Sequence, residues 1–482
     1  MAGIFGIALP NRYDDVVDRI ETIRHRGGRG LAIVEHERAT LGEVHGPSLG
    51  MWLGRTPGCS AVFDGALFNW RELSPEAHDV DQAIQDAFEQ FGIGFLRKLD
   101  GPFALAVAHD DGVFVARDAV GIAPLYYGYR DGAMCFASEA KALLGWAFDV
   151  REFPPGHCCG ADGCFIAFSE AAGKAPETIG SPAQTLRSTL SEAVTKRAST
   201  TGDLGCWLSG GVDSSAMAAL ATLCVPKLKT FAVGLEGAPD LAFAQQVATH
   251  IDSEHFEMRL EPEALIKALP DVIRALESFD ALLVRSSLTN YFVGRLASDN
   301  AEAVLSGEGG DELFAGYDYL KHIPESELNS ELVDITGRLH NTALQRVDRC
   351  SSAHGLKAFV PFLDGEVRRL AFSMGQDLKI CRDSGVVDKW VLRQAVAPLL
   401  PAEVATRPKA KFWEGAGVTD VIESYADSII SDEVFLRNRV LPDGASLNTK
   451  EEYLYFLMFT ESFGELDDYS FMGRTKNAPR AA

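Results

Sequence analysis

The chain has few basic residues for its length, and this shortage narrows the partners it can bind. Its 482 residues include Lys+Arg 45 against Asp+Glu 68, which gives a formal net charge of −23. Nonspecific nucleic-acid binding needs many Lys and Arg to neutralise phosphates, so we expect no nucleic-acid partner. A small anionic ligand remains compatible with the acidity, because local side chains and a divalent cation can offset the global charge.

Cysteine, long apolar runs and a leader segment are also missing or scarce. Nine cysteines are too few for a disulfide framework, and their odd number leaves at least one thiol unpaired. No apolar run reaches the roughly 18 residues of a membrane span. The opening MAGIFGIALPNRYDD has no basic segment ahead of a long apolar one. These absences predict a cytoplasmic enzyme with no membrane partner.

The pattern of apolar and turn-forming residues differs between the two halves of the chain. Up to about residue 170, short β-rich runs alternate with Gly and Asp, and one helix is expected from Asp81 to Gln90. After a segment rich in Gly, Ala and Pro, Ser181 and Gln184 have the spacing of a helix capping box. Strands and helices alternate from there, which predicts a parallel sheet covered on both faces. We therefore expect an α+β domain over 1–165 and an α/β domain over 181–475.

A glycine-rich loop follows the first strand of the second half and opens a helix. Adjacent glycines let the backbone turn tightly and aim N–H groups at an anion, and the helix N-terminus adds its dipole. Asp213 in this loop suits a Mg²⁺ ion that accompanies phosphate. No GxxxxGK[ST] is present, so a Walker-type nucleotide site lacks its lysine. The residues expected to contact the nucleotide here are Leu208, Ser209, Gly210, Gly211, Asp213 and Ser214.

A second loop of the same kind follows the apolar strand AEAVLS. It reads Ser306-Gly307-Glu308-Gly309-Gly310-Asp311-Glu312. Because ligands of parallel α/β sheets bind at the carboxyl ends of the strands, we expect the two loops to converge there.

With these loops the chain resembles the asparagine synthetase (glutamine-hydrolysing) family and its β-lactam synthetase relatives. The resemblance implies an N-terminal Ntn-hydrolase-like sandwich of antiparallel sheets. It also implies a C-terminal synthetase domain of the PP-loop (adenine nucleotide alpha hydrolase-like) class. Further motifs that carry it are Arg24-His25-Arg26-Gly27, Phe63-Asp64-Gly65, Ala137-Ser138-Glu139, Phe231-Ala232-Val233-Gly234-Leu235, Val360-Pro361-Phe362-Leu363-Asp364, Leu392-Arg393 and Arg407-Pro408-Lys409.

The resemblance also implies a reaction and the roles of single residues. In the family a carboxylate attacks the α-phosphate of ATP, and an amine or ammonia then displaces AMP to form an amide. Asp213 and Asp311 match the carboxylates that hold Mg²⁺ and pyrophosphate, and Ser209, Val233, Ser306 and Gly307 match nucleotide contacts. Lys409 matches the lysine that stabilises developing charge, Glu308 matches the base, and Arg285 matches a retained arginine of the acceptor stretch. Small-molecule substrates and a homodimer are implied as partners.

Two regions depart from the family. The glutaminase nucleophile is a cysteine after the initiator Met, and here that residue is Ala2. The glutamine-binding Asn-Gly-Glu reads Asp64-Gly65-Ala66. We therefore predict that the N-terminal domain has only a structural role.

The acceptor stretch departs as well, with Leu282 and Leu283 in place of two hydroxyl residues, and Lys357 starts the triplet where the family has Glu-Ala-Arg. These changes make aspartate doubtful and favour a more apolar or differently charged carboxylate, although the leucines alone are also explained by repacking of the core. Retention of Glu308 favours an amine from a second molecule.

Three alternatives stay open at this point. Intramolecular ring closure, as in β-lactam synthetases, uses the same adenylation. A catalytically silent relative is disfavoured because Asp213, Asp311, Glu308 and Lys409 are all present. A tRNA modifier that shares the pyrophosphate loop is disfavoured by the acidic composition.

Overall fold

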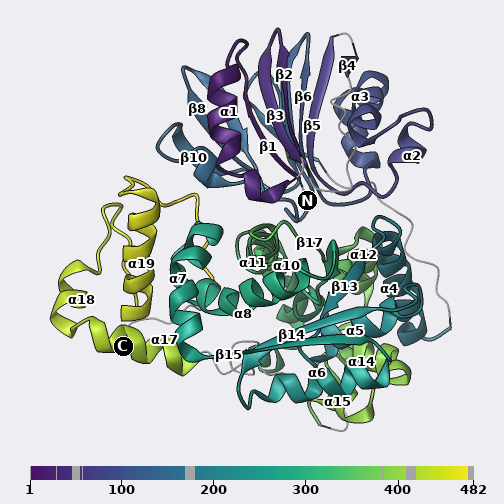
Figure 1. Ribbon diagram of the computed structural model, residues 1–482. Coiled ribbons are helices and arrows are strands. Elements are labelled where there is room, and N and C mark those ends of the chain that lie inside the picture. Colours follow the sequence, from purple (N-terminus) through teal and green to yellow (C-terminus); the bar gives the residue numbers. More distant parts are fainter. Residues whose placement is uncertain are drawn as a thin grey trace.

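The N-terminal part of the chain is a sandwich of two antiparallel sheets. The computed structural model describes residues 2–28, 30–45, 55–56, 58–168, 180–382, 385–408 and 419–475. Figure 1 shows this part above the rest of the molecule. One six-stranded sheet has the order β10-β8-β9-β1-β3-β2 and the other β12-β11-β7-β6-β5-β4. The strands are β1 (Ala2–Ile7), β2 (Gly30–His36), β3 (Ala39–His45), β4 (Arg55–Thr56), β5 (Cys59–Gly65), β6 (Phe103–His109), β7 (Gly112–Arg117), β8 (Tyr126–Arg130), β9 (Ala133–Ala137), β10 (Phe148–Glu152), β11 (His157–Cys159) and β12 (Phe165–Ala167).

Short helices lie against the sandwich. The helix expected at 81–90 is α3 (Val80–Phe91), and it begins where the Asp79 side chain accepts a hydrogen bond from the Gln82 backbone. Its apolar residues Ala83, Ile84 and Ala87 are buried against the second sheet. The remaining helices of this part are α1 (Tyr13–Glu21), η1 (Arg24–Arg26), α2 (Trp70–Leu73), η2 (Gly92–Lys98) and η3 (Ala140–Ala142).

The C-terminal part is built on a parallel five-stranded sheet of order β15-β14-β13-β16-β17. The strands are β13 (Leu204–Trp207), β14 (Lys229–Leu235), β15 (Glu254–Leu260), β16 (Ala303–Leu305) and β17 (Lys357–Phe359). Cys206, Phe231 and Val304 on the three middle strands have no exposed surface, because helices cover both faces of the sheet. Both expected sheet types are therefore confirmed.

The first helix of this part begins as the sequence predicts. Ser181 and Gln184 form the reciprocal capping box, and Pro182 is the first helical residue. The domain boundary itself stays a prediction, because residues 169–179 lie outside the described residues. The helices are α4 (Pro182–Ala198), α5 (Val212–Ala221), α6 (Pro239–His250), α7 (Pro262–Leu276), α8 (Ala281–Ser298), α9 (Gly310–Phe314), η4 (Asp318–Lys321), α10 (Glu325–Gly337), η5 (Leu339–Asn341), α11 (Ala343–Ser352), η6 (Pro361–Leu363), α12 (Gly365–Ser373), α13 (Gln376–Lys379), α14 (Trp390–Val396), η7 (Ala397–Leu399), α15 (Ala402–Thr406), α17 (Thr419–Ile429), α18 (Asp432–Asn438) and α19 (Lys450–Phe463).

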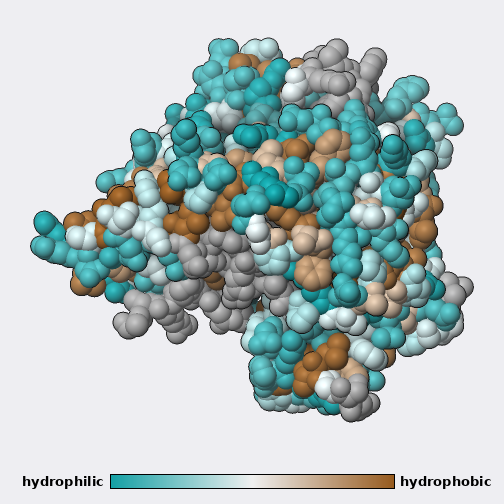
Figure 2. Space-filling model, turned by 60° about the horizontal axis from the view of Figure 1, so that its bottom comes forward, coloured by the Kyte–Doolittle hydropathy of each residue, from teal (hydrophilic) through white to brown (hydrophobic). Residues whose placement is uncertain are grey.

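The structure also describes the cysteines and the exposed apolar side chains. None of the described helices is long and apolar enough to cross a membrane. All nine cysteines are free thiols. In Figure 2 hydrophobic atoms gather toward the left, on the side where Figure 1 places α18 and α19. The exposed apolar side chains of this region are Ile429, Val434, Leu436, Val440 and Leu457.

Candidate functional site

The first glycine-rich loop connects β13 to α5 in a conformation that only glycine suits. Gly210 has a φ of +69°, and a Cβ on it would lie 2.4 Å from Cβ of Phe243. The hydroxyls of Ser209 and Ser214 lie 3.0 Å apart, and the Gly211 amide donates to the Ser209 hydroxyl over 3.4 Å. The loop is thus held in place at the N-terminus of α5, where a phosphate is favoured.

The second loop packs directly on the first. A Cβ on Gly307 would lie 2.7 Å from the Ser214 amide nitrogen, and one on Gly310 would lie 2.6 Å from Oδ1 of Asp213. Only residues without side chains allow so close an approach. The two loops therefore converge at the carboxyl edge of the sheet, as the sequence predicts.

A buried lysine that sequence reasoning missed joins the two loops. Nζ of Lys389 forms ion pairs with Asp213 and with Asp311, the latter over 2.5 Å. Its side chain is 1% exposed. Lys389 has a φ of +51° and directly precedes α14, whose Arg393 belongs to a motif already noted. No local sequence pattern marks this lysine as a partner of the two loops.

The two carboxylates have the chemistry of a magnesium site. Mg²⁺ prefers carboxylate and phosphate oxygens and is commonly bound by one or two carboxylates together with substrate phosphates. Within the described residues, no group of three or more His, Cys, Asp or Glu is arranged to hold a metal by itself. Asp213 and Asp311 thus fit an ion that arrives with the nucleotide.

Beyond the loops lie two further carboxyl groups with partners of their own. Glu308 accepts a hydrogen bond from Arg346 over 2.8 Å, and Arg346 also donates to the Ser286 hydroxyl over 2.9 Å. The Tyr317 hydroxyl donates to Glu312. Burial, together with the nearby Asp311 and Glu308, raises the pKa of Glu312 to about 8. Burial and the neighbouring carboxylates thus favour the protonated form of Glu312.

These groups line one cavity of about 820 Å³. Trp207, Phe231 and Leu241 bound it near the first loop, and helices α8, α10 and α11 contribute its other end. Among the described residues, Arg407 also lines it and pairs with Asp240 over 2.5 Å. The site residues predicted from the sequence that line the cavity are Leu208, Ser209, Gly211, Asp213, Ser214, Val233, Ser306, Gly307, Glu308 and Asp311.

Two predicted residues that the structure describes do not line the cavity, and a third is not described. Gly210 shapes the first loop without lining the cavity. Lys409 lies outside the described residues. Arg285 belongs to α8 but points away, and its guanidinium pairs with Glu451 of α19 and with Glu423. The residues of α8 that line the cavity include Leu282, Ser286, Asn290 and Val293. They are spaced three or four positions apart and so share one face of the helix, and Arg285 lies on a different face.

The N-terminal part meets the C-terminal part through a cluster of buried charges. Arg26, 1% exposed, donates to the Ala2 carbonyl over 3.0 Å and pairs with Asp64 over 3.0 Å. It also forms two hydrogen bonds, of 2.7 and 3.0 Å, with Asp348 of α11. The place of the expected nucleophile is thus occupied by a methyl group beside an ion cluster.

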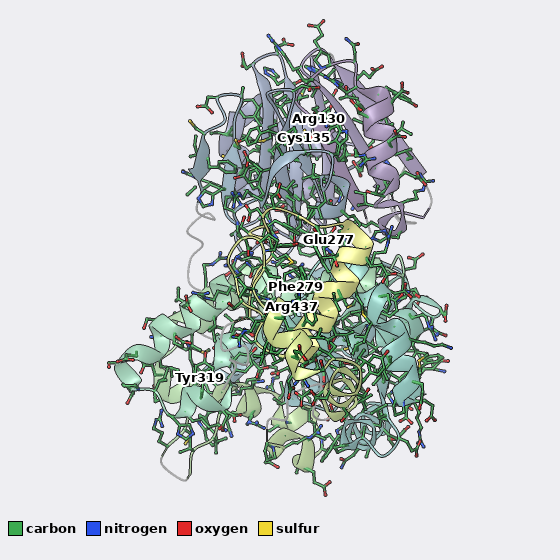
Figure 3. All side chains as sticks on the ribbon, turned by 90° about the vertical axis from the view of Figure 1, so that its left-hand side faces the viewer. Arg130, Cys135, Glu277, Phe279, Tyr319 and Arg437 are labelled. Atoms are coloured by element: carbon green, nitrogen blue, oxygen red, sulfur yellow. The ribbon has the colours of Figure 1, made fainter. Side chains whose placement is uncertain are left out.

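Further charged members of this cluster come from the C-terminal part. Lys357 of β17 donates to the Gly65 carbonyl, and burial lowers the pKa of Lys357 to about 8. Arg349 of α11 pairs with Glu277 over 3.3 Å, and Glu277 lies at the junction of the two parts (Figure 3). The unusual residues Asp64 and Lys357 therefore belong to one interface.

The parallel sheet, its two loops and the joined sandwich define a nucleotide-binding ligase attached to an amidotransferase-like domain. The family model of asparagine synthase matches residues 185–333 and 322–479, and that of the glutamine amidotransferase domain matches residues 1–153. The chain belongs to the asparagine synthetase family and is an ATP-dependent carbon–nitrogen ligase.

Individual relatives agree with this assignment. Asparagine synthetase [glutamine-hydrolyzing] 3 of Arabidopsis thaliana is 35% identical and covers 93% of this chain and 84% of its own length. Asparagine synthetase [glutamine-hydrolyzing] 2 of Oryza sativa subsp. japonica is 31% identical and covers 96% and 84%. A glutamine phosphoribosylpyrophosphate amidotransferase from B. subtilis is 17% identical, with a TM-score of 0.31 over 47% of this chain and 65% of that one, which is too low to support an argument.

Proposed function

We propose that this ligase adenylates a carboxylate with ATP and transfers the acyl group to ammonia or a small amine without hydrolysing glutamine. The observation that carries the proposal is the convergence of Asp213, Asp311 and Lys389 on one cavity that also holds Glu308. A carboxylate oxygen bonds to the α-phosphorus while the bond to pyrophosphate breaks. The amine then bonds to the acyl carbon, AMP leaves, and a proton passes to a base.

The residues of the cavity suit these steps. Asp213 and Asp311 would hold Mg²⁺, which neutralises phosphate charge when bound. Lys389, with Lys409 as a further predicted cation, balances the negative charge that develops on the phosphates. Glu308, fixed by Arg346, is the proposed proton acceptor. Since Arg285 does not line the cavity, its proposed part is to hold α19 against α8.

The absence of glutaminase activity rests on the N-terminal residues. The Ala2 methyl group cannot form a thioester with glutamine, and Arg26 donates to the backbone at that residue. Asp64, in place of a neutral amide, is committed to Arg26 and to the Ser138 hydroxyl, the latter over 2.8 Å. The amine is therefore expected from solution.

The decisive experiment measures pyrophosphate and AMP release over a panel of carboxylic acids, with and without ammonium or small amines. Asp311→Asn should abolish release, whereas Asp252→Asn, an exposed aspartate away from the cavity, should retain it. Absence of release with every acid would refute adenylation. Release without amine, with a product lighter by water, would instead establish ring closure.

A second assay addresses the N-terminal domain. With ammonia removed enzymatically, glutamine should support no amide formation and should yield no glutamate. Glutamate formation under these conditions contradicts a purely structural role. A homodimer and a cytoplasmic location stay predictions, and light scattering measures the former.

A further inference from the structure

The cavity has a second end, away from the two glycine-rich loops. It lies between the N-terminal turn of α8 and the helices α10, η5 and α11. Polar and apolar side chains both line this end. We call five of the apolar ones the acyl wall: Leu282, Leu283, Ile335, Leu339 and Ala343. The wall belongs to the same cavity as Asp213 and Glu308, so a molecule that reaches the nucleotide also reaches the wall.

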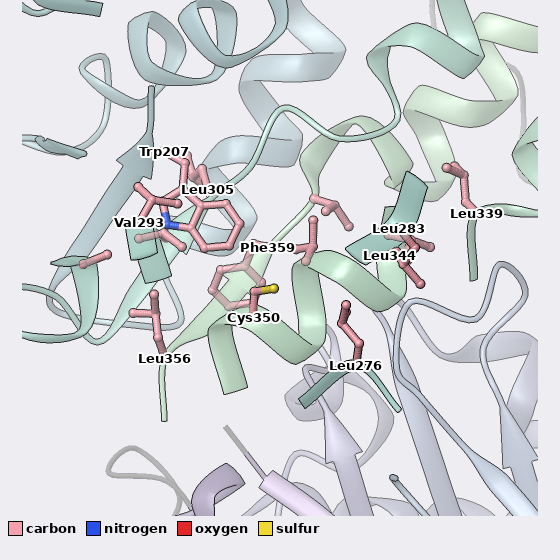
Figure 4. Close-up of a cluster of buried hydrophobic side chains, with 14 of the residues drawn as sticks. Trp207, Leu276, Leu283, Val293, Leu305, Leu339, Leu344, Cys350, Leu356 and Phe359 are labelled. Atoms are coloured by element: carbon pink, nitrogen blue, oxygen red, sulfur yellow. The ribbon is translucent and has the colours of Figure 1, made fainter. Parts of the chain in front are cut away.

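Three of the five side chains of the acyl wall, Leu283, Ile335 and Leu339, belong to the buried core. Leu283 and Leu339 are 3% and 2% exposed. Figure 4 shows Leu283 beside Leu344 of α11, with Leu339 at the edge of the same cluster. Rigid apolar walls favour apolar ligands, because water in contact with them makes few hydrogen bonds.

Polar and charged side chains near the acyl wall already have partners in one another. Arg346 holds Glu308 over 2.8 Å and Ser286 over 2.9 Å, and Tyr317 donates to Glu312. A substrate with an ammonium group or a second carboxylate would have to break one of these pairs or remain unpaired in a buried place. Both are costly.

We propose that the carboxylate substrate is a monocarboxylic acid with an apolar chain or ring that lies on the acyl wall, and that aspartate is a poor substrate. The inference rests on the proposed adenylation, since it names the acid that this same site uses. Leu282 and Leu283 are then residues that determine specificity.

Binding tests this inference independently of turnover. Calorimetry with the full chain, Mg²⁺ and an ATP analogue carrying a methylene group between the α- and β-phosphorus avoids the reaction. Each methylene added from butyrate to hexanoate should strengthen binding about fourfold, or about 15-fold over two. L-Aspartate and succinate should bind at least about tenfold more weakly than hexanoate. Equal or tighter binding of aspartate, or no gain with chain length, overturns the proposal.

A matched pair of variants tests whether the chain-length dependence of binding arises at the acyl wall. Leu282→Thr should weaken hexanoate binding about fivefold while butyrate changes less. Leu296→Thr alters a half-buried leucine of the same helix that does not line the cavity, and it should bind both acids as the parent does. Circular dichroism checks that both variants fold. An unchanged hexanoate affinity in folded Leu282→Thr refutes the assignment.

Pyrophosphate release separates this inference from the proposed function. Apolar acids that bind but release no pyrophosphate with ATP and any amine would refute adenylation and leave the acyl wall in place. Release with aspartate at a higher kcat/KM than with hexanoate would support adenylation and refute the apolar substrate.

Discussion

Replacement of Lys389 by methionine should strongly destabilise the free enzyme and make its stability depend on Mg²⁺. The lysine is 1% exposed, and the carboxylates of Asp213 and Asp311 that it joins are each 13% exposed. Removal of one partner of a buried ion pair costs about 3–5 kcal/mol, because the remaining charge is left uncompensated. Since both aspartates keep some contact with solvent, we expect about 3 kcal/mol, a large part of a typical unfolding free energy.

Mg²⁺ should restore part of the unfolding free energy that Lys389→Met loses. In Lys389→Met the two carboxylates repel each other, and a divalent cation can take the place of the ammonium. At ten times its Kd, Mg²⁺ adds about 1.4 kcal/mol by mass action. Chemical denaturation with and without MgCl₂ measures both effects, and the parent enzyme should respond less because its lysine competes with the ion.

Lys379→Met is the matched control. Lys379 has no exposed surface, but its ammonium meets the Asn329 side-chain oxygen at 3.5 Å and the Phe372 ring rather than a carboxylate. Burial lowers the pKa of Lys379 to about 8. Loss of this isolated charge should be neutral or stabilising, with no Mg²⁺ response. Equal losses in the two variants, or a Lys389→Met enzyme as stable as the parent, would refute the reasoning.

Two further predictions concern the interface. Asp348→Asn removes the charge that Arg26 meets through two hydrogen bonds and should cost roughly 3 kcal/mol in urea unfolding. Asp334→Asn, at an exposed pair on α10, should cost less than about 1 kcal/mol, and a similar loss in both would contradict the cluster's importance. Burial lowers the pKa of Lys357 to about 8 from 10.5, so between these values the unfolded chain binds a proton that the folded chain does not, and stability rises with pH. Relative to Lys357→Met, the parent should gain up to about 1.4 kcal/mol per pH unit above pH 8; parallel pH profiles would show that Lys357 keeps its proton.

The strand and loop pattern allowed both sheet types and the convergence of the two loops to be predicted from sequence. Glycine spacing fixes those loops locally, so Ser209, Asp213, Glu308 and Asp311 were accessible to sequence reasoning. Lys389 was not, because it meets Asp213 across 176 positions and no local pattern encodes that contact. Strand β15 was also missed, since EHFEMRL at the sheet edge has no continuous apolar run.

Arg285 is a residue for which the sequence predicted a place in the site that the structure does not show. Its presence in a family-like stretch suggested a place in the cavity, whereas the rotation of α8 makes Leu282 and Ser286 line the cavity instead. Its partner Glu451 lies 166 positions away. Likewise, Asp64 and Lys357 each stood out in sequence as departures, but only the packing of β17 against the end of β5 shows that they belong together.

Helix α11 has a consequence for how the molecule comes apart. It carries Arg346 at the cavity and, within one turn, Asp348 and Arg349 at the interface. The sandwich contributes two cations and two anions to that interface, Arg26, Lys141, Asp64 and Glu139, and the synthetase part contributes the same numbers, Arg349, Lys357, Glu277 and Asp348.

Each set sums to zero, so long-range attraction does little to bring the two parts together. Separation would break the buried ion pairs that Arg26, Lys141 and Glu139 of the sandwich form with Asp348, Glu277 and Arg349, respectively. Heating should therefore unfold both parts in a single transition. In a synthetase part expressed alone, α11 would lack its partners from the sandwich, and the cavity wall that it forms would be less well ordered.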